Sequence, residues 1–133
     1  RTLAEKVLAL ARASHHPDYV RQLQDKIRHT YDLYFLMQEP DIQAFVASED
    51  FFTILQAVQA DDAKNSEFQG AWALQSLTAA KIYQDDQALW KELEKTYAGS
   101  FQSLVYGTLP PIDDIRQVLS QLAKRLQTFD QLR

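Results

Sequence analysis

The chain contains no cysteine, and only three glycines and four prolines are present among its 133 residues. The absence of cysteine excludes disulfides and thiolate metal sites, and it is compatible with a reducing cytoplasm, where we expect the protein to be located. Because glycine and proline are scarce while Ala, Leu, Gln, Lys and Glu are abundant, the composition favours helices over a turn-rich β architecture. We therefore expect an all-α fold, a single helical bundle of about five to seven helices.

The chain also lacks an excess of basic charge and any long apolar run. Its formal net charge is −4, with both signs interspersed, so it lacks the basic surface with which proteins neutralise nucleic-acid phosphates. Any contact with nucleic acid would therefore depend on another domain. No apolar run approaches the roughly 20 residues that a membrane-spanning helix needs, and no signal-peptide pattern is present. We expect no membrane partner.

The beginning of the chain already has the pattern of a helix start. Residue 1 is arginine rather than methionine, and Thr2 and Glu5 have the spacing of a capping box, in which Thr2 caps the helix and Glu5 reaches back to it. The natural protein is therefore expected to extend upstream. We expect residues 1–133 to form one C-terminal helical domain of a larger protein.

Hydrophobic periodicity and helix start and stop signals divide the chain into segments. The clearest helix start and stop signals are Pro17, Ser48 and Gly107. A final amphipathic helix follows the pair Pro110 and Pro111, which ends the preceding segment. A polar stretch covers residues 61–70. The expected helices span about residues 2–13, 17–38, 41–47, 48–60, 85 or 86 to 105, and 112–129. Residues 72–83 are ambiguous, because their apolar anchors lack clean periodicity, but a helix is favoured there too.

The adjacent ionisable residues at positions 15–16, 61–62 and 85–86 do not predict a metal site. The pairs at residues 61–62 and 85–86 are both Asp-Asp, and neighbouring positions on a helix point in different directions, so we expect solvated helix ends or caps there. His15 and His16 precede a proline and have no obvious third ligand. We therefore expect no metal site in this chain.

Lys6 and Asp32 are the leading candidates for a functional site. Residues 33–37 make the helix after Asp32 apolar nearly all round, and a carboxylate buried there without a partner would cost several kcal/mol. Asp32 should therefore be paired, protonated or directed at something outside this chain. Two simpler interpretations remain open. Arg28 and Asp32 could form a surface ion pair contributing a few tenths of a kcal/mol, and Lys6 could bury its stem while its ammonium stays in water.

A missing upstream part could change these simple roles. If it packs over this end of the helix, Lys6 and Asp32 would line a seam between domains, where ligand sites often form. An ammonium at such a seam can hold a phosphate, and a nearby carboxylate can position it or deprotonate an attacking hydroxyl. Lys6 and Asp32 together therefore indicate a ligand site more strongly than either residue does alone.

Two motifs carry a resemblance to a known family. The pattern Arg-Thr-Leu-x-Glu-Lys-Val-Leu-x-Leu at residues 1–10 and the pattern Arg-His-x-Tyr-Asp-Leu-Tyr at residues 28–34 resemble the C-terminal half of the AbiEii/AbiGii-type toxin nucleotidyltransferases. Residues 97–107, the proline pair and the last helix are similar to the tail of the same proteins. Members are type IV toxin–antitoxin or abortive-infection proteins that transfer a nucleotide from a nucleoside triphosphate, some of them to tRNA ends.

The resemblance implies roles for four residues. It assigns the catalytic lysine and aspartate of the family to Lys6 and Asp32, and it implies that Lys6, Arg28 and His29 bind the nucleotide. In the family, the metal-binding Gly-Ser and Asp-x-Asp elements lie in the preceding domain, and no Gly-Ser followed by a spaced Asp-x-Asp occurs in this chain.

The expected parent protein would therefore use Mg²⁺ and a nucleoside triphosphate, with the metal ligands in an N-terminal nucleotidyltransferase core that is absent from this sequence. Its expected partners are that N-terminal domain, possible tRNA acceptors and a cognate antitoxin that acts indirectly. This chain alone should be inactive, because phosphoryl-type transfer needs metal-held phosphates and an aligned nucleophile. The alternative is a non-catalytic helical interaction module whose exposed aromatic face binds a protein partner.

Overall fold

The computed structural model describes residues 1–68, 70–105 and 107–132, and in these ranges it contains seven α-helices and no strand. The predicted all-α bundle of five to seven helices is therefore confirmed. Short 3₁₀ and π turns connect some of the helices. The α-helices are α1 (Thr2–Ser14), α2 (Tyr19–Asp25), α3 (Ile27–Leu36), α4 (Pro40–Ala47), α5 (Glu49–Ala63), α6 (Gln87–Thr96) and α7 (Ile112–Leu132).

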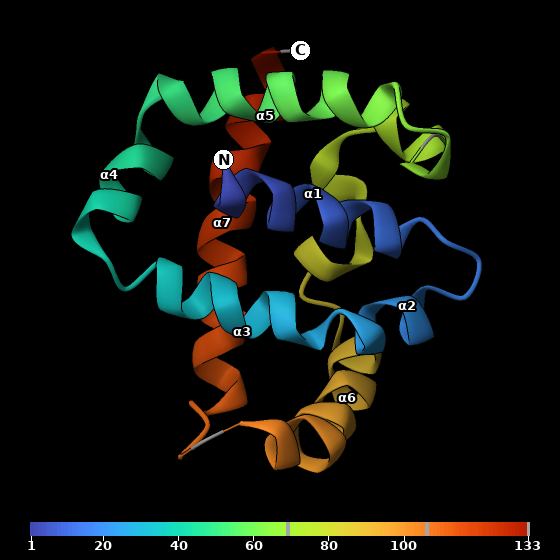
Figure 1. Cartoon of the computed structure of the whole chain (residues 1–133), viewed down its shortest axis with the longest axis vertical. Helices are drawn as coiled ribbons and strands as arrows, with labels where there is room; N and C mark the ends of the chain where they lie inside the picture. The colour runs from blue at the N-terminus through green and yellow to red at the C-terminus, as the bar shows by residue number, and fades with distance from the viewer. Residues whose placement is uncertain (69, 106, 133) are drawn as a thin grey trace.

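The helices are arranged around α7. Figure 1 shows α5, α1 and α3 lying one beside the other across α7, with α4 joining α3 to α5 at one edge. The helix α1 is in the middle, since it packs against both α3 and α5, and α3 packs directly on α7. The helix α6 lies at the opposite end of the molecule from α5 and packs against α2. This arrangement brings residues of α1 next to residues that are 20 to 60 positions away in the sequence.

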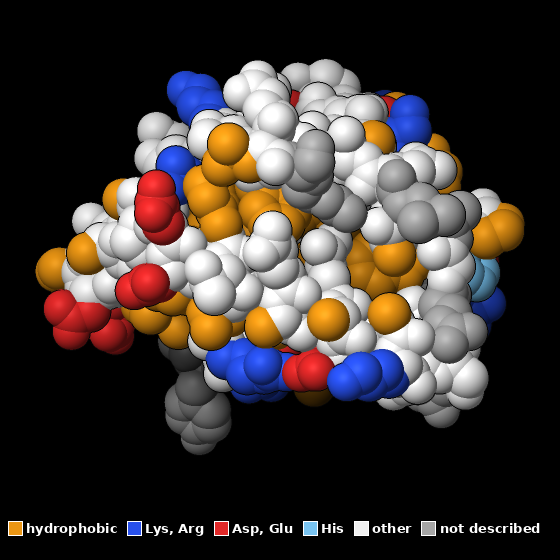
Figure 2. Space-filling model, turned by 90° about the horizontal axis from the view of Figure 1, so that it is seen from above, with side chains coloured by type: hydrophobic (Ala, Val, Ile, Leu, Met, Phe, Trp, Pro, Cys, Tyr) orange, Lys and Arg blue, Asp and Glu red, His pale blue; other side chains and the backbone are white. Residues whose placement is uncertain are grey.

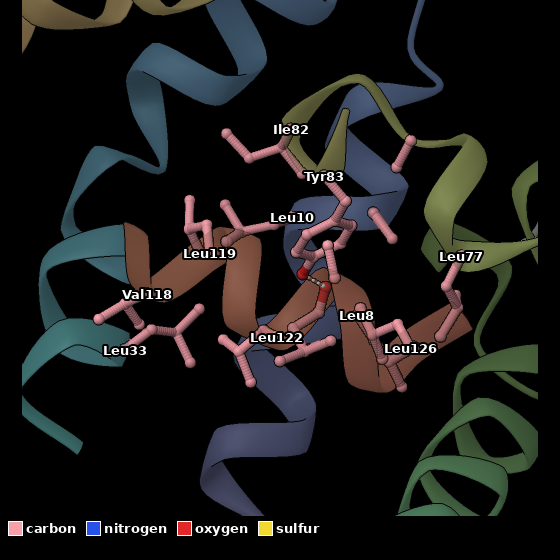
Figure 3. Packing of buried hydrophobic residues seen from close by; sticks show 14 of the residues in the cluster. Leu8, Leu10, Leu33, Leu77, Ile82, Tyr83, Val118, Leu119, Leu122 and Leu126 are labelled. Carbon is pink, nitrogen blue, oxygen red and sulfur yellow. Dashed lines mark hydrogen bonds between the residues drawn. The ribbon is translucent and has the colours of Figure 1, made fainter. Parts of the chain in front are cut away.

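The final helix forms as the sequence predicts. It follows Pro110 and Pro111, its first turn is acidic, and its buried side chains recur every three or four residues. Figure 3 shows leucines of α1 and α7 pointing into one apolar cluster, which also receives Leu33 from α3. Burial of each such leucine contributes about 1.5–3 kcal/mol before entropy is counted. The buried residues of α7 are Ile115, Val118, Leu119, Leu122, Ala123, Leu126 and Phe129.

Polar groups also fix the position of α1. The Tyr83 hydroxyl is buried and donates a hydrogen bond to the Val7 carbonyl oxygen at 2.6 Å, and burial raises the pKa of this phenol well above its usual range. The Ser14 hydroxyl donates to the Leu10 carbonyl and accepts from the Ile82 amide. These bonds join α1 to η4 (Lys81–Tyr83) and satisfy groups whose burial would otherwise be unfavourable.

The predicted capping box at Thr2 is wrong. Thr2 is the first residue inside α1, the N-cap residue is Arg1, and no side chain caps the helix. The Glu5 carboxylate instead pairs with the Arg1 guanidinium at 3.3 Å, and the same guanidinium also binds Asp61 on α5. The Glu5 carboxylate is therefore engaged in an ion pair instead of reaching back to Thr2 as a capping residue.

The single helix expected across residues 17–38 is divided in two. It begins at Tyr19 rather than Pro17, and Lys26 interrupts it with φ −107° and ψ 18°, between α2 and α3. The interruption changes the direction of the chain, so that α2 packs against α6 while α3 packs on α7. Leu23 and Leu33 are both buried as a result, each in a different part of the core.

The segment 72–83 is not the regular helix that we expected. It folds as three 3₁₀ turns, η2 (Ala71–Leu74), η3 (Leu77–Ala79) and η4. Its apolar anchors lack helical periodicity, and the carboxylate of Asp130 on α7 accepts hydrogen bonds from the backbone amides of Leu77 and Thr78. Local 3₁₀ bonds, together with these contacts to α7, therefore satisfy the backbone of this stretch. Gln69, which belongs to the expected polar stretch before it, lies outside the described residues.

The expected helix starting at residue 85 or 86 is confirmed in its first part. The Asp86 side chain caps α6 by accepting a hydrogen bond from the Leu89 amide at 3.0 Å. Beyond α6 the chain continues as a π-helical turn at Tyr97–Phe101 and then as a 3₁₀ turn at Gln102–Leu104. Tyr106, in the tail segment of residues 97–107, is not among the described residues.

The surface has mixed charge, as the sequence suggested. Seen from above, Lys or Arg and Asp or Glu side chains alternate along the lower edge of the molecule, and hydrophobic side chains are visible between polar ones (Figure 2). A search of the described part of the chain finds no helix with the length and apolar character that crossing a membrane requires.

Candidate functional site

The two leading candidates from the sequence meet in the structure. Lys6 on α1 donates a hydrogen bond from Nζ to Oδ2 of Asp32 on α3, at 3.0 Å. The side chains are 19% and 26% exposed, so both are largely but not completely shielded from water. Of the three states expected for Asp32, namely paired, protonated or directed outside the chain, the structure shows the paired one, with the lysine of the neighbouring helix as the partner.

The other two predicted residues lie at the same place. His29 Nδ1 is 3.5 Å from Lys6 Nζ, and Arg28 Nε is 3.9 Å from Asp32 Oδ2. Arg28 is well exposed, so its pair with Asp32 is the helix-surface ion pair of the simpler interpretation, present in addition to the Lys6 contact. We call Lys6, Arg28, His29 and Asp32 the Lys6 cluster.

The position of the cluster follows from how α3 packs. Ile27, Thr30 and Leu33 face the core and are buried. Because side chains one turn apart share a helix face, the residues at 28, 29 and 32 are left together on the accessible side toward α1. The apolar residues after Asp32 suggest a helix covered on all sides. The structure does not show this, since Phe35 is 46% exposed.

The imidazole of His29 is held neutral by its surroundings. Burial is the main factor that lowers the pKa of His29 below its ordinary value of 6.5, and the positive charges of Lys6 and Lys26 lower it further. The charge of Asp32 acts in the opposite direction but is weaker. A neutral imidazole can accept a hydrogen bond at Nδ1, which suits its position beside the Lys6 ammonium.

Two surface hollows meet at Lys6. One has a volume of about 250 Å³ and is lined by Lys6, Arg12 and His29 together with Asp62 and the ring of Phe68; we call it the Arg12 hollow. The other has a volume of about 380 Å³; we call it the Phe35 hollow. Lys6 lines both, so its ammonium lies between a hollow that contains the Arg12–Asp62 pair and one with aromatic walls.

The walls of the Phe35 hollow combine apolar and acidic side chains. Tyr31, Phe35 and Leu36 supply its apolar surface. Asp32 and Glu39 supply carboxylates. Such a combination of apolar walls and a few polar groups is typical of small-molecule sites.

The sequence reasoning missed a second ion pair on α1. Arg12 Nη1 lies 3.4 Å from Asp62 Oδ2 on α5, and the Arg12 guanidinium carbon lies 3.8 Å from the centroid of the Phe68 ring. Asp62 is mostly buried, so the expectation of a solvated acid is wrong for it, whereas Asp61 is half exposed. Only the spacing of Arg12 on the same face of α1 as Glu5 could have indicated that it reaches this hollow.

Burial is the main influence on the charges of this second pair. It lowers the pKa of Arg12 below its ordinary value, although the negative charge of Asp62 acts against it. It also raises the pKa of Asp62, although the positive charge of Arg12 acts against that change. The loss of hydration therefore outweighs the mutual attraction at both groups, and the pair is not a large source of stability.

No metal site is found among the described residues. They contain no group of three or more His, Asp or Glu side chains that could hold a metal ion. Asp85 pairs with Arg116 at 2.7 Å, Asp86 caps α6, and His16 accepts a hydrogen bond from the Asp18 amide.

Comparisons with known proteins point to one family. The family model described as "Nucleotidyl transferase AbiEii toxin, Type IV TA system" matches residues 1–126. The match includes the whole Lys6 cluster, both hollows and most of α7. Neither the curated proteins nor the solved structures gave a significant match.

Proposed function

Since this chain belongs to the AbiEii nucleotidyl transferase toxin family of type IV toxin–antitoxin systems, we propose that it is the helical C-terminal domain of a two-domain enzyme. That enzyme transfers a nucleotide from a nucleoside triphosphate to an acceptor, with a tRNA end as the candidate acceptor. The contact between Lys6 and Asp32 is the observation that carries the proposal, because it joins an ammonium and a carboxylate at the edge of two hollows.

Lys6 is proposed to bind a phosphate oxygen of the nucleotide. Its ammonium has three N–H donors and is held in place by Asp32 and by the imidazole of His29. A cation fixed in advance stabilises the negative charge that develops on the phosphates without further reorganisation. Arg28, which is exposed beside Asp32, is proposed to add positive charge at the same edge.

Asp32 is proposed to act on the acceptor hydroxyl. The hydroxyl oxygen attacks the α-phosphorus, its proton passes to the Asp32 carboxylate, the bond from the α-phosphorus to the bridging oxygen breaks, and pyrophosphate leaves. The same carboxylate positions Lys6 by accepting its hydrogen bond. As the family resemblance implies, the metal used by the family would be bound by an N-terminal domain.

Several further properties follow from this proposal. The chain alone would be inactive, because it supplies only part of the site. The N-terminal nucleotidyltransferase domain would pack over the Lys6 cluster, and a cognate antitoxin would act on the system indirectly. The net charge of −4 and the mixed surface charge support the view that the helical domain does not bind RNA strongly by itself.

The test measures nucleotide transfer by the complete protein that carries this chain, with each of the four nucleoside triphosphates and a tRNA pool. Lys6→Met and Asp32→Asn should each lower turnover by about a hundredfold or more, as expected for removal of a transition-state contact or a general base. Lys95→Met and Asp25→Asn are matched controls, because both residues are exposed and lie outside the cluster. Near-normal turnover by a folded Lys6 or Asp32 variant would remove that residue from the proposed role.

A non-catalytic interaction module remains the second candidate, and the exposed ring of Phe35 favours it. The two candidate functions differ in what the complete coding sequence must contain. A catalytic parent needs an upstream carboxylate pair for the metal, whereas an interaction module does not. A complete coding sequence without that pair, together with loss of partner capture in Phe35→Ala, would support the interaction module.

A further inference from the structure

Phe35 is an exposed aromatic side chain next to the proposed reacting groups. Three large hydrophobic side chains are exposed among the described residues, namely Phe35, Leu104 and Leu132. Only Phe35 lines one of the hollows described above, and it does so together with Lys6 and Asp32. The exposed face of this ring, beside a charged pair, is available to a flat apolar ligand.

Neighbouring rings hold Phe35 in a defined orientation. Its ring centroid lies 4.8 Å from that of Tyr31 and 5.1 Å from that of Tyr34, in both cases with edge-to-face geometry. Tyr31 is in turn fixed by an edge-to-face contact with Phe101, at 5.2 Å. Because Phe35 is on a regular helix and supported from two sides, it offers a ring face that needs little ordering when a ligand binds.

The charges around the Phe35 hollow fit a nucleobase with its phosphates. Lys6 lies where the Phe35 hollow and the Arg12 hollow meet, so a phosphate bound by Lys6 leaves the aromatic side free for a ring. On the other side, the guanidinium of Arg12 is paired with Asp62, and His29 lies beside Lys6. On the ring side, the carboxylates of Asp32 and Glu39 can accept hydrogen bonds from amino or imino groups of a base.

We propose that Phe35 stacks on the base of the nucleoside triphosphate whose phosphates Lys6 binds. This inference rests on the proposed function and adds a substrate-binding residue that the two motifs did not indicate as functional. Stacking of a base on an aromatic side chain tolerates different bases, because each base has a π face. Selection among bases would then come from Glu39 at the edge of the hollow.

The experiment measures binding of ATP, GTP, CTP, UTP, inorganic triphosphate and a single-stranded RNA oligonucleotide to the complete protein. The variants are Phe35→Ala, Phe35→Trp and Lys6→Met. Leu104→Ala is the matched control, because this side chain is 79% exposed and lines neither hollow. Thermal unfolding of every variant shows whether the fold is intact.

In Phe35→Ala, the Kd of the tightest-binding nucleotide should rise by about five- to a hundredfold, the range expected for loss of one stacking contact. The Kd of inorganic triphosphate should stay within about twofold of the wild-type value, because it has no base. Phe35→Trp should keep nucleotide affinity. Lys6→Met should weaken both nucleotide and triphosphate.

The results separate this inference from the proposed function. Nucleotide binding that is weakened by Lys6→Met but unchanged in Phe35→Ala overturns the stacking role alone. The same holds if Phe35→Ala weakens triphosphate as much as nucleotide, or weakens only the RNA oligonucleotide. If the wild type binds no nucleotide, or if Lys6→Met has no effect, the proposed function fails as well.

Discussion

The two sides of α1 carry similar ion pairs in different surroundings. Toward α3, Lys6 pairs with Asp32 at 3.0 Å, and the side chains are 19% and 26% exposed. Toward α5, Arg12 pairs with Asp62 at 3.4 Å, and the side chains are 20% and 16% exposed. Distance and burial therefore do not distinguish the two pairs, and neither would indicate by itself which one takes part in chemistry.

The neighbours of each cation make the difference. The Arg12 guanidinium lies over the Phe68 ring and 5.7 Å from the centroid of the Trp72 ring, so packing as well as charge holds it in place. The Lys6 ammonium contacts only polar groups, Asp32 and His29. A planar cation on aromatic rings suits a fixed structural contact, whereas a compact ammonium can exchange one polar partner for another. The seam between α1 and α3 is therefore the better place for a ligand.

The largest expected effect comes from reversing the pair in the α1–α3 seam. The double variant with Lys6→Asp and Asp32→Lys keeps an ion pair, so urea unfolding should show a free energy within about 1 kcal/mol of the wild type. Nucleotide transfer by the complete protein should nevertheless fall at least about a hundredfold, because the ammonium and the carboxylate have exchanged positions. Retained activity would show that the pair is only structural.

Removing the two cations separately should affect stability unequally. Arg12→Met should lower the free energy of unfolding by about 1–3 kcal/mol, because it removes the cation–π contact and leaves the mostly buried Asp62 without this partner. Lys6→Met should cost less than about 1 kcal/mol, since Asp32 keeps Arg28 nearby. Urea denaturation of both variants provides the measurement. Equal losses would contradict the distinction between a packed pair and an open one.

A conservative change tests whether the shape of Arg12 matters beyond its charge. Arg12→Lys keeps a positive charge near Asp62 but replaces the flat guanidinium over Phe68 by an ammonium. The expected loss is about 0.5–1 kcal/mol, smaller than for Arg12→Met. Combining Arg12→Lys with Phe68→Leu should cost less than the sum of the two single changes, because both remove the same contact. Full additivity would show that the ring and the cation act independently.

The smallest expected effect is the pH dependence contributed by His29. Its pKa in the folded protein is lowered below 6.5, so the unfolded chain takes up a proton more readily. The stability contribution of neutral His29 is therefore complete above about pH 6.5 and is lost as the pH falls toward the lowered folded-state pKa. His29→Gln should make the free energy of unfolding less sensitive to pH between about pH 7.5 and 5.5 than in the wild type.

A direct titration sharpens the same prediction. Lys6 is the largest charge that lowers the pKa of His29, whereas Arg12 is the smallest of the named influences. The NMR titration of the His29 ring should therefore shift to higher pH in Lys6→Met and shift less in Arg12→Met. His15, whose pKa is lowered by burial, provides an internal reference that neither change should move. Equal shifts of His29 in the two variants would contradict the geometry of the cluster.

The sequence predicted the helices with strong periodicity and misjudged those that depend on distant contacts. The helix α7 was predicted accurately because its apolar residues recur every three or four positions over five turns. The break at Lys26 was not predicted, since the residues on both sides favour helix and only packing on two different neighbours separates α2 from α3. The segment 72–83, whose periodicity was unclear, forms 3₁₀ turns, and Asp130 on α7 binds the amides of Leu77 and Thr78 in the middle of it.

The sequence alone determined that the chain is helical and that Arg28, His29 and Asp32 lie within about one helical turn of one another. These properties follow from composition and from the 3.6-residue period. Only the tertiary structure decided that Lys6 meets Asp32, that Arg12 packs on Phe68 beside Asp62, and that Phe35 stays exposed. Contacts between helices depend on how their faces pack in three dimensions, and a local pattern does not contain that information.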